Sequence, residues 1–88
     1  MEKTFKIISA NGLHARPAAE LAREAGRWAA SIKLRVLGRT VDVKSIMGLL
    51  SLAAGRGTEI QLIVEGNQEA EAFQALSKLI THDLAEIL

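Results

Sequence analysis

Residues 31–43 of the chain, SIKLRVLGRTVDV, decide its fold class. From Ser31 to Leu37 apolar residues alternate with polar or basic ones, and this period of two is typical of a strand with one buried face. The alternation resumes at Val41, after the dipeptide Gly38-Arg39. Glycine in the first position of a two-residue loop favours a type II′ turn, whose twist matches that of the flanking strands. The stretch therefore predicts a β-hairpin.

The chain before the hairpin predicts a strand followed by a helix. Residues 4–8 are rich in β-branched and aromatic side chains, and they are followed by the turn dipeptide Asn11-Gly12. Pro17 is compatible with a helix only in the first turn, where its missing N–H leaves no hydrogen bond unmade. We therefore expect the helix to begin at His14 or Ala15. Its apolar face repeats at helical spacing through Ala18, Leu21, Ala22 and Ala25.

The chain after the hairpin supplies the remaining elements. Residues 46–53 are too apolar for a solvated loop and end at Gly55-Arg56-Gly57, so they predict a short helix. Residues 59–65 predict a fourth strand, and apolar residues at helical spacing from Phe73 to Ile87 predict a long helix. The order β-α-β-β-α-β-α predicts an α+β fold. We expect a two-layer, open-faced sandwich, in which three helices cover one face of a four-stranded antiparallel sheet.

Composition excludes several classes of protein. The chain has 88 residues, and its 11 basic and 10 acidic side chains give a net charge of +1, so no direct binding of nucleic acid is expected. It has no cysteine, which excludes disulfides and thiol catalysis. Neither a signal peptide nor an apolar run of roughly 20 residues occurs, so we expect no membrane insertion and a cytoplasmic location. No linker or repeat interrupts residues 1–88, which are predicted to form one domain.

The run GLHARPA, residues 12–18, places a histidine at the start of the first helix. The backbone N–H groups of Ala15 and Arg16 have no acceptor inside such a helix, and the helix dipole adds positive charge there. Both features favour a bound phosphate, to which the Arg16 guanidinium can add a forked contact. His14 is then a nucleophile beside an anion site. No second histidine or carboxylate pair lies nearby in sequence, so we expect catalysis to come from partner enzymes.

The run GLHARPA and the run VKSIMGLLSLAAGRGTEI, residues 43–60, resemble the HPr family of phosphocarriers of the bacterial sugar phosphotransferase system. The resemblance spans the whole chain and is of the Gram-positive type. It implies that His14 accepts a phosphoryl group on Nδ1 from phosphorylated enzyme I and donates it to the A domains of sugar-specific enzymes II. It implies that Arg16 assists both transfers, that no cofactor is needed and that the carrier is a monomer.

Ser45 opens the short helix and is predicted to be its N-cap, a role that stabilises a helix by about 1 kcal/mol. The resemblance adds a regulatory function. In HPr proteins of Gram-positive type the matching serine is phosphorylated by HPr kinase/phosphorylase, and the phosphoserine form binds a catabolite-control transcription regulator. A phosphate here adds about two negative charges beside the partner surface and is expected to weaken the docking of acidic partners.

The short helix carries more apolar side chains than one face can bury. Ile46, Met47 and Leu50 match positions with which the family contacts enzyme I and enzymes II. Leu49 and Leu52 are expected in the core, and Trp28 at its edge. His82 is expected to be a solvated residue of the last helix.

Three alternatives remain open at this stage. The first is an HPr-like regulatory phosphoprotein in carbon or nitrogen control, without direct sugar uptake. The second is an adaptor that uses the apolar patch and in which His14 is incidental. The third is a small metal-binding protein, which is disfavoured because His14 and His82 offer too few ligands at a useful spacing.

Overall fold

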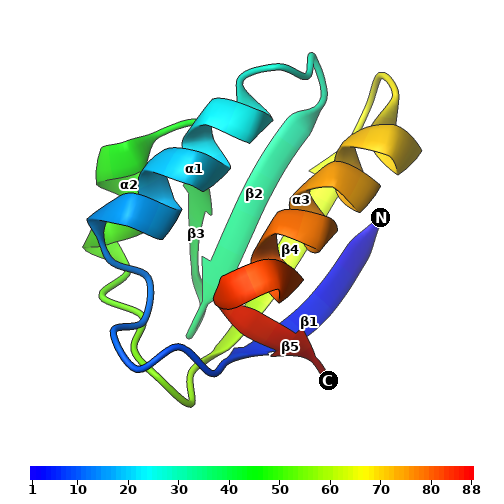
Figure 1. Ribbon diagram of the computed structural model, residues 1–88. Coiled ribbons are helices and arrows are strands. Elements are labelled where there is room, and N and C mark those ends of the chain that lie inside the picture. Colours follow the sequence, from blue (N-terminus) through cyan, green and yellow to red (C-terminus); the bar gives the residue numbers. More distant parts are fainter.

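The computed structural model describes residues 1–88 as five strands and three helices. The strands form one antiparallel sheet in the order β3-β2-β4-β1-β5, and all three helices lie against one face of it (Figure 1). This confirms the α+β open-faced sandwich. The elements are β1 (Glu2–Ile7), α1 (Ala15–Ala25), β2 (Ser31–Val36), β3 (Arg39–Asp42), α2 (Ile46–Ser51), β4 (Glu59–Glu65), α3 (Glu69–Asp83) and β5 (Ala85–Ile87).

The two faces of the sheet differ as the sequence alternation requires. Along β2 and β4, every second side chain is buried against the helices, and these side chains belong to one cluster of 24 buried residues. The opposite face is polar. There the Arg35 guanidinium donates to the Gln61 side-chain oxygen at 3.1 Å, and the Gln61 amide donates to Glu2 at 2.9 Å. The helices therefore pack against the apolar face of the sheet, and the polar face is left to solvent.

The sheet has five strands, so the prediction of four strands and of a last helix reaching Ile87 was wrong at the C-terminal end. Helix α3 ends at Asp83, and β5 pairs antiparallel with β1. The Leu84 carbonyl accepts hydrogen bonds from the N–H groups of Ile8, at 2.9 Å, and Ser9, at 3.1 Å. These bonds join segments that lie at opposite ends of the chain. The helical periodicity of the last segment therefore could not predict that its final residues form a strand.

The hairpin turn also differs from the prediction. Val36 pairs with Arg39, so the two-residue loop is Leu37-Gly38 rather than Gly38-Arg39. Leu37 has φ +50° and Gly38 has φ +81°. Positive φ at both central residues is typical of a type I′ turn, not type II′. The turn therefore holds a leucine in the left-handed region, and the 92% exposure of this leucine means that no packing compensates for the strain.

We expect the substitution Leu37→Asn to stabilise the protein by about 1 kcal/mol. Asparagine tolerates the left-handed region better than leucine, and Asn-Gly is the favoured pair for a type I′ turn. The exposed leucine side chain loses no packing when it is removed. Urea denaturation measures the change, with Leu37→Ala as the control, because alanine removes the apolar group and gains no turn preference. Equal stability of the two variants would contradict this account of the turn.

None of the three helices combines the length and the hydrophobicity that a membrane span requires.

Candidate phosphoryl-accepting site

His14 is the residue immediately before α1, as the position of Pro17 predicted. Its backbone is extended, with φ −92° and ψ −171°, and its half-buried imidazole makes no capping hydrogen bond to the helix. The N–H groups of Ala15 and Arg16 donate to no acceptor, and the first backbone bond of the helix runs from Ala18 to the His14 carbonyl at 3.1 Å. An imidazole and two unpaired amides thus meet at one helix end.

The first turn of α1 carries a positive charge. Arg16 is exposed and forms no ion pair, and the first turn of α1 contains no acidic residue. The helix dipole adds to this positive charge. The site can hold a phosphate group, because amide donors and an uncompensated guanidinium are the groups that anions bind in proteins.

The loop that leads to His14 is braced against the loop after α2. The Leu13 N–H donates to the Ala54 carbonyl at 2.9 Å, and the Leu13 side chain is buried. Gly12 has φ +62°, and a β-carbon there would lie 2.5 Å from the Ala54 carbonyl oxygen and 2.8 Å from the Gly55 α-carbon. The sequence predicted Gly12 as part of a turn, but it did not predict this close approach to Ala54 and Gly55. The brace depends on a contact between distant segments, which local sequence does not reveal.

Ser45 is the N-cap of α2, as predicted. Its hydroxyl accepts a hydrogen bond from the Gly48 N–H at 3.0 Å, and the residue is exposed. The neighbouring residue Lys44 is held by the segment that follows α1, because its ammonium donates to the Trp28 carbonyl at 2.8 Å. The Ser45 hydroxyl is therefore accessible from solvent while the helix stays folded.

Helix α2 presents apolar side chains to solvent, and we call Ile46, Met47 and Leu50 the docking patch. Met47 is 76% exposed, whereas Leu49 of the same helix is fully buried. Leu52 is buried as well, so the expected division between exposed and core residues is confirmed for this helix. Helix α2 packs against α1 (Figure 1). The docking patch therefore lies on the element beside the helix that His14 begins.

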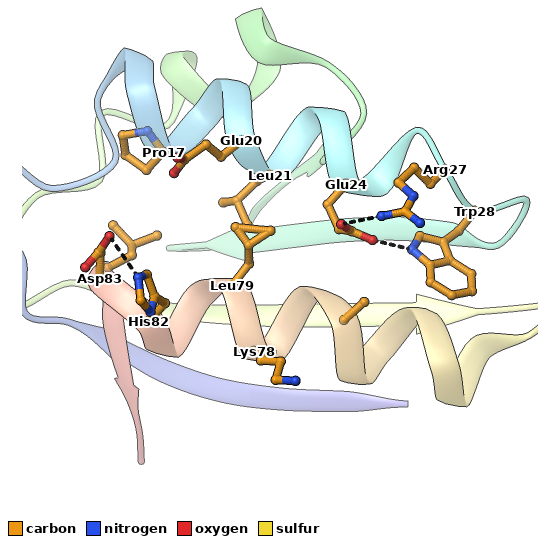
Figure 2. A pocket seen from close by; sticks show the side chains of 12 residues that line it. Pro17, Glu20, Leu21, Glu24, Arg27, Trp28, Lys78, Leu79, His82 and Asp83 are labelled. Carbon is orange, nitrogen blue, oxygen red and sulfur yellow. Dashed lines mark hydrogen bonds and ion pairs between the residues drawn. The ribbon is translucent and has the colours of Figure 1, made fainter.

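A groove of about 560 Å³ runs between α1 and α3, with Leu21 and Leu79 between the two helices (Figure 2). At one end the Trp28 indole N–H donates to Glu24 at 3.0 Å, and at the other His82 lies 3.7 Å from Asp83. Trp28 packs at the edge of the core and His82 is exposed, as expected. The groove is lined by neither His14 nor Arg16. This groove therefore does not include the histidine side chain.

Comparison with known proteins places this architecture in a family. The family described as the PTS HPr component phosphorylation site matches residues 1–82. The HPr-like protein Crh of Halalkalibacterium halodurans is 48% identical over 80 residues, which cover 91% of this chain and 95% of the relative. The crystal structure of HPr from Bacillus anthracis has a TM-score of 0.82 at 43% identity, with 90% and 94% of the two chains covered. Crh of Bacillus subtilis, solved as a domain-swapped dimer, has a TM-score of 0.75 at 43% identity, with 84% and 85% covered. The chain belongs to the HPr family of phosphocarriers.

Proposed function

We propose that the chain carries a phosphoryl group on Nδ1 of His14 from phosphorylated enzyme I to the A domains of sugar-specific enzymes II. The observation that supports this most directly is the free imidazole beside the unpaired amides of Ala15 and Arg16. In the transfer a bond forms between Nδ1 and phosphorus while the bond from phosphorus to the donor breaks. The amides, the helix dipole and Arg16 then stabilise the charge on the phosphoryl oxygens. The carrier is proposed to act in the cytoplasm.

The chain holds its phosphoryl group and does not itself catalyse the transfer. One arginine and two amides stabilise a phosphohistidine lightly, which keeps the group easy to hand on. No cluster of three or more candidate metal ligands accompanies the histidine. The rate enhancement is therefore assigned to the enzymes that dock on the patch.

Incubation with enzyme I and phosphoenolpyruvate tests the proposal. We expect an acid-labile mass gain of one phosphate, mapped to the peptide that contains His14. Addition of an enzyme IIA domain is then expected to remove it. No mass gain overturns the carrier function and leaves the adaptor alternative. A gain that no IIA domain removes favours the regulatory alternative, which the 48% identity to an HPr-like Crh protein also supports.

We further propose that Ser45 is a regulatory phosphorylation site for HPr kinase/phosphorylase and that the phosphoserine form binds a catabolite-control transcription regulator. The hydroxyl is exposed at a helix start, where added negative charge is compatible with the helix dipole. The charge would stand beside Ile46 and Met47 of the docking patch and disfavour acidic partners.

The Ser45→Ala variant is expected to take up no phosphate from HPr kinase and ATP. It should also lose about 1 kcal/mol of stability with the cap. Ser31→Ala provides the control, because Ser31 is an exposed serine at the start of β2 and caps no helix. Peptide mapping that finds phosphate on another residue would refute the assignment.

The carrier is proposed to act as a monomer. The dimer solved for Crh of Bacillus subtilis makes the oligomeric state worth measuring directly. Light scattering on the purified chain, with and without phosphate on Ser45, distinguishes the two states.

A further inference from the structure

Helix α2 depends on contacts at its two ends. It has six residues, of which only Leu49 is buried. A helix of this length is not stable alone in water. The Ser45 hydroxyl satisfies an amide at its start, but the carbonyl groups at its end also need donors.

Arg39 supplies donors at that end. It is the first residue of β3, and its Nη1 donates to the Ser51 carbonyl at 2.9 Å while its Nη2 donates to the Ser51 hydroxyl at 3.2 Å. The Ser51 hydroxyl in turn donates to the Gly48 carbonyl at 2.6 Å. The guanidinium thus holds the last turn of α2 both directly and through one serine.

Both the charge and the shape of the Arg39 side chain suit this position. A cation near the C-terminal end of a helix is favoured by the helix dipole. Arg39 forms no ion pair with a carboxylate, so its charge is directed at this helix end rather than compensated elsewhere. A lysine ammonium lacks the planar fork that reaches both oxygens of Ser51.

We infer that Arg39 is a positioning residue for docking: it fixes the end of α2 and thereby the orientation of Met47 and Leu50 toward partner enzymes. The inference rests on the proposed function and adds a residue that touches neither His14 nor Ser45. It predicts that Arg39, on β3, affects the affinity for partner enzymes and does not affect the phosphoryl transfer step.

The experiment measures phosphoryl transfer from enzyme I with the carrier as the varied substrate. Arg39→Gln is expected to raise KM roughly threefold to tenfold with kcat unchanged. Arg39→Lys is expected to recover only part of this loss. Arg35→Gln is the matched control, because Arg35 is an exposed arginine on the neighbouring strand whose hydrogen bonds reach Thr40 and Gln61, away from α2. Met47→Ala gives the reference for loss of a patch contact.

Amide hydrogen exchange supplies the second measurement. The N–H groups of Leu52 and Ala53, which bond to carbonyls of α2, are expected to exchange faster in Arg39→Gln and not in Arg35→Gln. Unchanged KM and unchanged exchange in Arg39→Gln overturn the inference. Full rescue of KM by Arg39→Lys with unchanged exchange also overturns it, because Arg39 then meets the partner by charge. If the unmodified chain takes up no phosphate at all, the proposed function fails, and the exchange result still reports on the contact between Arg39 and α2.

Discussion

The His14→Ala variant is expected to take up no phosphate from phosphorylated enzyme I. The substitution removes the only nitrogen nucleophile beside the unpaired amides of Ala15 and Arg16. Its effect on stability should be small, since the imidazole makes no capping hydrogen bond to α1. Intact-mass spectrometry after incubation with enzyme I and phosphoenolpyruvate measures the loss, and thermal unfolding verifies that the variant is folded.

His82 provides a close control for this substitution. It is the only other histidine of the chain, and its side chain is 79% exposed on α3. We expect His82→Ala to accept phosphate at the rate of the unmodified chain. If uptake persisted in His14→Ala and disappeared in His82→Ala, the phosphoryl acceptor would be His82 and not His14.

The Gly12→Ala variant is expected to lose both stability and transfer activity. Alanine at φ +62° costs about 1 kcal/mol in backbone energy, and its β-carbon would overlap the backbone at Ala54 and Gly55. The loop must shift, which displaces His14 from the unpaired amides. We expect the free energy of unfolding to fall by more than ~2 kcal/mol and kcat/KM with enzyme I by roughly a hundredfold.

Gly55→Ala tests whether this effect belongs to the close contact. Gly55 has no positive φ, and a β-carbon built there meets no atom within 4 Å. Near-normal stability and transfer are expected for it. If both variants lose activity equally, the loss reflects general sensitivity of the loops and the brace at Gly12 is not required.

The elements that could be predicted are those whose signal is local. The alternation along β2 and the single-sided helix α1 each depend on a repeating pattern. Pro17 restricted the start of α1 to His14 or Ala15, and the helix begins at Ala15. Predictions failed where pairing decides the outcome. Strand β5 exists because β1 offers it an edge, and the turn Leu37-Gly38 follows from the register between β2 and β3.

The candidate site divides in the same way. The positions of His14, Arg16 and Ser45 at helix starts were predicted from short motifs, since a helix start can be located from local sequence. The brace between Leu13 and Ala54 and the bonds from Arg39 to Ser51 join segments far apart in the chain. Such contacts follow from how the hairpin and the loops pack, so single residues such as arginine or glycine give no sign of them in the sequence.

The brace has a thermodynamic consequence for encounters with partner enzymes. Because the Leu13 N–H donates to the Ala54 carbonyl, two residues after the C-cap of α2, the loop that leads to His14 is linked directly to the segment that follows the docking patch. Under the proposed function, a partner bound to α2 would therefore meet His14 at a restricted distance and direction, and less orientational entropy would be lost before the phosphoryl group is transferred. Such a carrier would be able to bind its partners weakly, exchange them rapidly and still present the His14 nitrogen in the same place at each encounter.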